Sequence, residues 1–378
     1  MRHFLSKAAL LAVLAVFFTF NLQAQKTAYN DSWGTQGLSI EAQKDNGLTL
    51  NYSITEFTLV ENNIKDQVMK SVKMPGSLLP NNAGKPDLPG VGQLIALPEG
   101  AKATLKVTDY KTEIIENIAI APAPVIPFDT DKKPMKYEKD SKVYSQDRFY
   151  PANPFKLSQK LEIRGVDVVT LGITPFQYNP VTKELKIYRD IKFEVVFEGG
   201  KGQYGEDKYR SVFWESTLSQ NLINYNALPK IDFNKETNRT KDGEADYVII
   251  TIDDPDFIAK ANEIAEFRRK QGISTMVLTT ADLGGNTIAN IENWVDDAYN
   301  NWSNPIDAVL LLGDYSTSSD GITSHLYEHP YWGADDFASD NKYADVDGDE
   351  LPDVVFARIT AENTDQLNTM VSKFMDYE

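Results

Sequence analysis

Residues 247–278 read YVIITIDDPDFIAKANEIAEFRRKQGISTMVL, and this stretch decides the fold of the C-terminal part of the chain. An apolar run opens it and leads into Asp253-Asp254-Pro255, which is typical of a helix start. Apolar residues then recur with helical spacing up to Gly272, a residue that commonly follows a helix end. A second apolar run occupies residues 274–278. The stretch therefore predicts a buried strand, an amphipathic helix and a second buried strand.

The same alternation continues to the end of the sequence. Helical spacing at residues 288–298 is followed by apolar runs at 308–312 and 354–359, and by a last helical pattern at 367–375. Short buried strands that alternate with helices predict an α/β domain with a mainly parallel sheet and right-handed crossovers. The sequence stops inside or just after the last predicted helix, so we expect this sheet to be part of a larger one.

Three acidic residues lie where predicted strands end, at Asp253, Asp254 and Asp314. Parallel sheets bind ligands beyond the carboxyl ends of their strands, which makes these residues site candidates. Side chains that cap the next element are the alternative explanation.

Residues 47–200 instead show the period-2 alternation of strands, clearest at residues 48–54 and 187–197. Turn residues at 179–183 join the second of these to a predicted strand at 166–175. Prolines punctuate the region and make its connections stiff and extended. These features predict an all-β domain, a sandwich or a barrel.

The predicted organisation is multidomain: a signal peptide at 1–24, a β-rich domain at 25–200, a linker at 201–244 and the partial α/β domain at 245–378. The linker lacks a sustained period, and one short packed piece is expected at 212–225. Its Arg239 and Lys241 are candidate processing sites, since exposed basic positions in linkers are readily cleaved. Solvated basic residues with no processing role are the alternative.

The first residues follow the order of a secretory signal. Arg2 and Lys7 precede an uncharged run at 8–20, and the small residue Ala24 follows. This run is shorter than the roughly 20 residues that cross a bilayer, so we expect a secreted or cell-surface protein with no membrane span after signal removal. The 378 residues contain no cysteine, which excludes a thiol nucleophile of their own.

Charge is distributed unevenly along the chain. Residues 245–378 hold 26 Asp and Glu against 7 Lys and Arg, whereas the preceding residues hold 29 against 31, for a net charge of −17. Such an acidic surface repels phosphate backbones, so nucleic acid is not an expected partner. Cations or basic partners are favoured.

An acidic loop near the C-terminus carries carboxylates at its positions 1, 3, 5 and 9, namely Asp345, Asp347, Asp349 and Asp353. Hard oxygen ligands at alternating positions suit calcium, and a cation relieves the repulsion among four carboxylates. The loop is not an EF-hand, because Glu350 stands where that loop needs glycine. We predict a structural calcium site, with a plain acidic turn as the alternative.

The motif His325-Leu-Tyr-Glu328-His329 matches the H-x-x-E-H pattern of inverted zinc metallopeptidases. That chemistry requires both histidines on one face of a helix. Pro330 follows at once, and turn-forming residues 318–321 lie just upstream. We therefore predict a loop with two surface histidines, and zinc catalysis remains the weaker alternative.

Two groups of short motifs occur in a characteristic order along the chain. Residues 246–378 contain Phe267-Arg-Arg-Lys-Gln-Gly272, Leu311-Leu-Gly-Asp314, Ser339-Asp-Asn-Lys-Tyr343 and Ala357-Arg-Ile359. The β-rich region contains Arg148-Phe-Tyr-Pro-Ala-Asn-Pro154, Arg164-Gly165 and Tyr178-Asn-Pro180. With these motifs the chain resembles gingipain-type peptidases, peptidase family C25: residues 246–378 resemble the first half of the peptidase domain, and the β-rich region resembles the propeptide that precedes it.

This resemblance implies a secreted bacterial cysteine endopeptidase precursor that acts on proteins or peptides, with a caspase-like α/β fold and a His–Cys dyad. In the family the dyad follows the helix on which this sequence ends, so no catalytic residue is assigned and the chain alone is expected to be inactive. The resemblance also implies an intramolecular contact between propeptide and catalytic domain, in which the propeptide acts as inhibitor and folding aid. A non-catalytic secreted calcium-binding surface or adhesion protein is the alternative.

Overall fold

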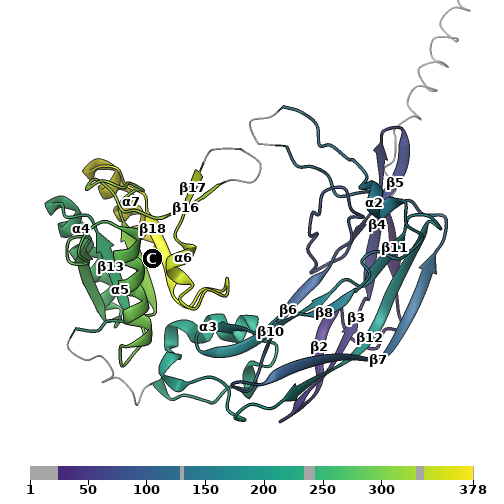
Figure 1. The fold of residues 1–378 in the computed structure, drawn as a ribbon, viewed down its shortest axis with the longest axis horizontal. Coiled ribbons are helices and arrows are strands. Elements are labelled where there is room, and N and C mark those ends of the chain that lie inside the picture. Colours follow the sequence, from purple (N-terminus) through teal and green to yellow (C-terminus); the bar gives the residue numbers. More distant parts are fainter. Residues whose placement is uncertain (1–23, 128–131, 234–242, 329–335, 378) are drawn as a thin grey trace, which may run out of the picture. The chain divides into compact units, whose positions relative to one another are not determined.

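The structure, a computed structural model, describes residues 24–127, 132–233, 243–328 and 336–377 (Figure 1). Most of the predicted signal peptide lies outside these residues, as do Arg239, Lys241 and His329. The chain forms two compact units. Unit 1 comprises residues up to 92 together with 104–157 and 171–196, and unit 2 comprises 93–103, 158–170 and 197–378.

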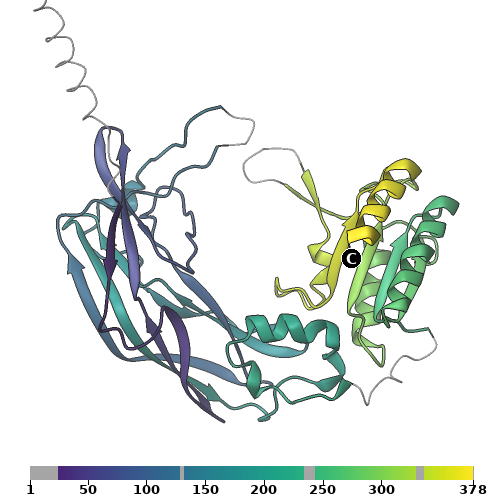
Figure 2. The ribbon, with the colours of Figure 1, turned by 180° about the vertical axis from the view of Figure 1, so that it is seen from behind.

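Unit 1 is built from strands, which confirms the β-rich prediction (Figure 2). One sheet has the order β1-β4-β5, a second the order β11-β12-β3-β2 with β7 on β12, and a third the order β6-β10-β8 with β9 on β10. All of β9 and parts of β6, β7, β10 and β12 belong to unit 2. The strands are β1 (Ala24–Ala28), β2 (Gly37–Lys44), β3 (Gly47–Ser53), β4 (Glu56–Ile64), β5 (Gln67–Lys73), β6 (Val91–Ala96), β7 (Lys102–Ile115), β8 (Phe155–Leu157), β9 (Leu161–Ile163), β10 (Val166–Ile173), β11 (Phe176–Asn179) and β12 (Glu184–Glu198), with a short helix α2 (Ser141–Tyr144).

Aromatic side chains link the sheets of unit 1. Phe57 of β4 meets Phe176 of β11 edge to face, with ring centroids 5.4 Å apart. Phe155 of β8 meets Phe193 of β12 in the same way at 5.3 Å. Edge-to-face pairs of this kind add to the burial of apolar area, so aromatic side chains pack both the first and the third sheet against the second.

The predicted strand at 166–175 is wrong in one respect, because it breaks after Ile173. The partner of β12 in the predicted hairpin is the separate strand β11, in which Phe176 lies opposite Ile187. Pro175 stands between the two strands. Since proline has no N–H to donate, it is suited to the point where the chain leaves one sheet and enters another.

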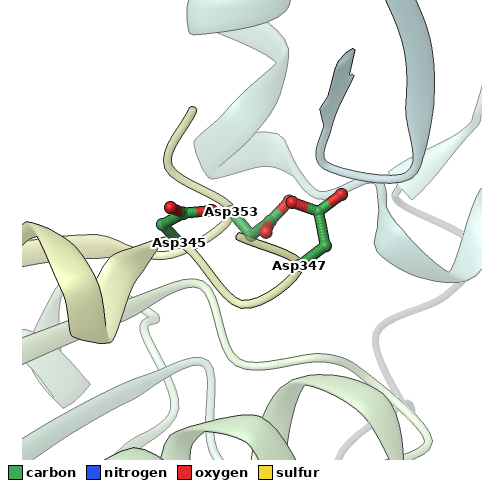
Figure 3. Close-up of side chains that lie close together, drawn as sticks. All are labelled: Asp345, Asp347 and Asp353. Carbon is green, nitrogen blue, oxygen red and sulfur yellow. The ribbon is translucent and has the colours of Figure 1, made fainter. Parts of the chain in front are cut away.

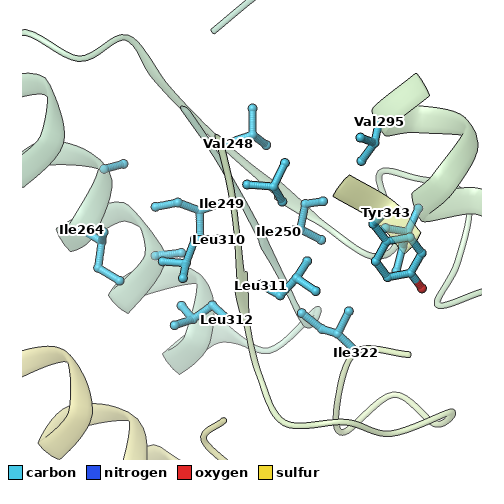
Figure 4. Close-up of a cluster of buried hydrophobic side chains, with 14 of the residues drawn as sticks. Val248, Ile249, Ile250, Ile264, Val295, Leu310, Leu311, Leu312, Ile322 and Tyr343 are labelled. Atoms are coloured by element: carbon cyan, nitrogen blue, oxygen red, sulfur yellow. The ribbon is translucent and has the colours of Figure 1, made fainter. Parts of the chain in front are cut away.

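The parallel sheet of unit 2 has the order β14-β13-β15-β18, and each described neighbour pair is parallel, as predicted. Helices cover both faces: Figure 4 shows Ile264 of α4 and Val295 of α5 on opposite sides of the strands. The elements are β13 (Tyr247–Thr251), α4 (Pro255–Lys270), β14 (Thr275–Thr279), α5 (Ile288–Asn300), β15 (Ala308–Leu312), β16 (His325–Glu328), β17 (Asp336–Ser339), α6 (Asn341–Ala344), β18 (Val355–Ile359) and α7 (Thr364–Tyr377).

Helix α4 shows why the local sequence gives these elements. The Asp254 carboxylate accepts hydrogen bonds from the backbone of Asp256 and Phe257, and Pro255 fills the first turn, where no N–H partner is needed. The apolar face of the helix is buried against the sheet. Gly272, with φ of 86°, takes the left-handed conformation that ends many helices.

The predicted linker contains packed structure. It holds η2 (Asp207–Tyr209), α3 (Val212–Asn221) and η3 (Tyr225–Ala227), and α3 is the short packed piece expected from the sequence. Trp214 and Leu218 of α3 are buried in a cluster with Val166 and Val168 of β10. The described residues of the predicted linker, 201–233 and 243–244, lie in unit 2 together with the parallel sheet. Within the described residues, no helix has both the length and the apolar character needed to span a membrane.

Candidate functional site

The acidic loop between α6 and β18 brings three carboxylates together. Asp345, Asp347 and Asp353 each offer one oxygen, and these oxygens lie within 4.8 Å of one another (Figure 3). Asp347 is exposed, Asp345 is half-buried, and Asp353 is 1% exposed. Three of the four predicted metal ligands therefore converge on one point.

Backbone N–H groups of the loop hold these carboxylates in place. The Asp345 Oδ1 atom accepts from the backbone of Gly348 and Asp349, each at 2.9 Å, and Asp353 Oδ2 accepts from Val346 at 3.1 Å. Gly348 has φ of 80°, a left-handed conformation for which glycine pays no steric cost. The turn around Gly348 thus points the carboxylates of Asp345 and Asp347 toward Asp353.

Asp349, the fourth predicted ligand, points elsewhere. Its carboxylate accepts from the backbone N–H of Leu351 at 2.8 Å and from the backbone N–H of Glu162 in β9. It is not among the converging carboxylates. The structure gives Asp349 a contact that spacing along the loop could not predict, because its partner is far away in sequence.

The electrostatics of the cluster favour a cation. Burial raises the pKa of Asp353 to about 7, and the charge of Asp347 adds to this, while hydrogen bonds from Val346 and Tyr299 act in the opposite direction. Burial and then Asp349 also raise the pKa of Asp347. These shifts mean that negative charge here is incompletely compensated. Because the donors are all hard oxygens, Asp345, Asp347 and Asp353 fit a calcium ion.

The candidate residues at the carboxyl edge of the sheet do not form a second cluster in the described part of the chain. Asp254 caps α4, as the alternative explanation proposed, and Asp253 is exposed. The edge is instead organised by Arg358 of β18. Its guanidinium donates two hydrogen bonds to the Asp340 carboxylate, at 2.9 and 2.8 Å, and others to the carbonyl oxygens of Gly313, Asp314, Ile322 and Thr323.

The H-x-x-E-H segment lies in a strand, so the predicted loop is wrong for residues 325–328. β16 pairs with β17 in an antiparallel hairpin. His325 Nε2 lies 3.6 Å from Glu292 Oε1, and its ring lies 5.1 Å from that of Tyr343. Residues three apart on a strand point to opposite faces, so His325 and Glu328 lack the shared helical face that the zinc motif requires.

A second polar network lies at the amino edge of the same sheet, and the sequence reasoning missed it. Arg164 is 1% exposed, and its guanidinium contacts Pro305, Ile306 and Asp307, immediately before β15. A cavity of about 480 Å³ adjoins this network. The sequence signal here was Gly165, since a glycine between hydrophobic residues is typical of a tight turn.

Comparison with known families covers nearly all of the described chain. Residues 37–233 match Propeptide_C25, and residues 240–378 match peptidase family C25. The chain belongs to peptidase family C25. This C25 chain therefore carries a propeptide part followed by a peptidase part, as the sequence motifs implied.

Relatives of this C25 chain include gingipains of Porphyromonas gingivalis. Gingipain R1 is 25% identical over 300 residues, which cover 78% of this chain and 28% of that protein. Gingipain R2 is 25% identical over 312 residues, covering 78% and 38%, and Lys-gingipain is 22% identical over 351 residues, covering 86% and 19%. The chain thus spans well under half the length of these relatives.

Two solved structures are similar to parts of this C25 chain. One is the complex of Porphyromonas gingivalis RgpB pro- and mature domains, at 21% identity and a TM-score of 0.45, covering 51% of this chain and 100% of that chain. The other, on the zymogenic latency of gingipain K from Porphyromonas gingivalis, has 24% identity and a TM-score of 0.41, covering 47% and 100%.

Proposed function

We propose that this chain is the propeptide and N-terminal peptidase segment of a secreted gingipain-like cysteine endopeptidase that acts on proteins or peptides, and that these 378 residues alone are inactive. One observation carries the proposal: the propeptide family and the peptidase family match in succession, in a sequence with no cysteine. A cysteine peptidase needs a thiolate nucleophile, which these residues do not supply.

The peptidase segment contributes a scaffold in this proposal. Arg358 ties the loops after β15 to Asp340, and so fixes the carboxyl edge, where parallel sheets place their reactive groups. The propeptide part contributes Arg164, which contacts the opposite edge. Secretion is supported by the signal-like order of charge and apolar residues in the first 24 residues.

Casein hydrolysis tests the proposal. The 378-residue chain and the product of the whole open reading frame that contains it are purified and assayed with and without iodoacetamide, which alkylates thiolates. We expect hydrolysis only from the whole product, and its loss after alkylation. Hydrolysis by the 378-residue chain that survives iodoacetamide would contradict the proposal, and inactivity of both proteins would favour the non-catalytic alternative.

Export is tested separately by expression in a bacterium with its own secretion machinery. We expect the protein outside the cytoplasm, with an N-terminus at Gln25 after cleavage behind Ala24. An exported protein that still begins at Met1 would show that this segment is not a cleaved signal.

We also propose that the acidic loop binds a structural calcium ion through Asp345, Asp347 and Asp353. An ion that binds the folded state stabilises it, so saturating calcium should raise the melting temperature by about 5 °C over protein in EDTA. Asp347→Asn should abolish most of this rise, whereas Asp376→Asn, at an exposed position outside the cluster, should retain it. Equal melting temperatures in calcium and EDTA would rule out a significant site.

A further inference from the structure

The tip of the β9–β10 hairpin projects an arginine. Arg164 and Gly165 have φ of 52° and 71°, so both central residues of this two-residue turn are left-handed. Two positive φ values define the type I′ turn, whose twist matches that of the flanking strands. The turn therefore places Arg164 at the end of a regular hairpin within unit 2.

The guanidinium of Arg164 is saturated with acceptors. Nε donates to the Tyr209 carbonyl at 2.6 Å, and Nη1 donates to the carbonyls of Ile306 at 2.7 Å and Asp353 at 3.2 Å. Nη2 donates to the Pro305 carbonyl at 2.9 Å and pairs with the Asp307 carboxylate. Buried arginines are tolerated when their donors are satisfied in this way, and lysine cannot reproduce the planar set.

Four of the five acceptors lie at one edge of the parallel sheet. Residues 305–307 immediately precede β15, and a single residue, Val354, separates Asp353 from β18. These are the amino ends of the strands, whereas ligands of such sheets bind at the carboxyl ends. Arg164 therefore contacts the edge opposite to the one at which parallel sheets bind their ligands.

Further contacts join the same segments. The backbone N–H groups of Glu162 and Arg164 donate to the carboxylates of Asp349 and Asp353. The Ser211 hydroxyl and the Trp214 indole N–H donate to the Asp307 side chain and backbone at 2.8 and 3.3 Å. Each contact joins a residue of the propeptide match, 37–233, to one of the peptidase match, 240–378.

We propose that the Arg164 hairpin tip anchors the propeptide part to the amino edge of the peptidase sheet and keeps it attached after the linker is cut. This attachment does not depend on contacts at the carboxyl edge of the sheet. This inference rests on the proposed division into propeptide and peptidase parts. Attachment of the propeptide part is then carried by contacts at the amino edge of the sheet.

The test uses the full chain with a recognition site for a specific protease inserted between Thr240 and Lys241. The protein is cut, and co-elution of the two fragments is measured by size-exclusion chromatography over a range of concentrations. We expect wild-type fragments to co-elute and Arg164→Met to weaken their association by at least about 100-fold, because truncating one partner of a buried charged pair leaves the other unpaired. Arg164→Lys should lie between them.

Arg189→Met is the matched control, since Arg189 pairs with Asp31 inside unit 1, and its fragments should co-elute like wild type. Wild-type fragments that separate on cutting, or Arg164→Met fragments that stay together as tightly as wild type, would overturn the proposal. Should Arg164→Met fail to fold before cutting, amide exchange decides the question in cut wild type: the N–H groups of Glu162 and Arg164 stay protected if the tip is anchored and exchange rapidly if it is not. Casein hydrolysis enters none of these outcomes, so failure of the anchor is distinct from failure of the proposed function.

Discussion

The Asp307 carboxylate, which pairs with Arg164, is the residue of this network whose charge can change near neutral pH. Burial raises the pKa of Asp307 to about 6, although Arg164 and Ser211 favour the charged form, and Asp246 nearby adds to the rise. The folded-state pKa thus lies above the ordinary value of 3.8. Protonation is therefore more favourable in the folded chain than in the unfolded one.

The sign of the pH dependence follows from this shift. The contribution of Asp307 to the free energy of unfolding is complete below about pH 4 and is lost as the pH rises through about 6. The stability of wild type relative to Asp307→Asn should therefore fall by an amount of the order of 2 kcal/mol between these values. Urea denaturation of both proteins from pH 4 to 7 measures it. A difference that grows with pH would show that attraction by Arg164 outweighs burial.

Alanine substitutions at Gly165 and Gly199 separate the free-energy cost of a side chain in the left-handed conformation from the cost of a steric clash. A Cβ atom at Gly165 would lie 2.6 Å from the ring of Tyr209, which is itself stacked on Tyr299. Gly199 has almost the same φ, 73° against 71°, and no atom within 4 Å of its added Cβ. We expect Gly199→Ala to cost about 1 kcal/mol of unfolding free energy and Gly165→Ala about 1–3 kcal/mol more. Equal losses in thermal denaturation would mean that Tyr209 moves aside.

At the residue scale, the sequence predicted those contacts that form between residues close together along the chain. Asp345 and Asp347 converge because they share one tight turn, and Asp353 closes the same loop. The partner of Asp349 is the backbone of Glu162, and that of Arg164 is Asp307, both from segments more than 100 residues away. The spacing of residues in the sequence cannot predict such pairs, because only tertiary packing brings them together.

At the scale of elements, helix α3 is the part of the predicted linker whose packing is most open to test. Trp214 is 2% exposed, whereas its neighbour Phe213 is 45% exposed. Trp214→Ala should cost about 3–5 kcal/mol of unfolding free energy through the cavity it leaves, and Phe213→Ala no more than about 1 kcal/mol. Denaturant titration compares the two variants. Similar losses would indicate that α3 is not docked as described.

The elements predicted correctly are those with strong local signals. α4 has a capping aspartate, a first-turn proline and a left-handed glycine at its end, and β15 is apolar throughout. The break after Ile173 and the strand β16 were missed for a different reason. The strand break and the strand β16 both depend on which sheet the chain joins. Hydrophobic periodicity indicates which face of a strand is buried, but it does not indicate the strand with which it pairs.

At the scale of the whole molecule, the compact units and the family matches divide the chain differently. Residues 158–170 belong to the propeptide match but lie in unit 2 with the peptidase match. The ion pair between Arg164 and Asp307 joins these residues to the rest of unit 2. The cluster around Trp214 contains Val166 and Val168, and the Trp214 indole donates a hydrogen bond to the backbone of Asp307. The boundary between the family matches therefore differs from the boundary between the compact units.

This difference predicts the order of local unfolding. Regions that share one cooperative unit open with similar free energies in native-state hydrogen exchange. Peptides covering 158–170 and 209–218 should therefore open together with β15 of unit 2, and at a free energy distinct from that of β3 and the part of β12 in unit 1. Mass spectrometry of exchange at rising subdenaturing urea resolves the groups. In Arg164→Met the segment 158–170 should open at lower urea than β15, whereas in Arg189→Met it should still follow β15. Exchange of 158–170 in step with β3 in wild type would show that the propeptide part unfolds as one body and that its hairpin tip belongs to that body.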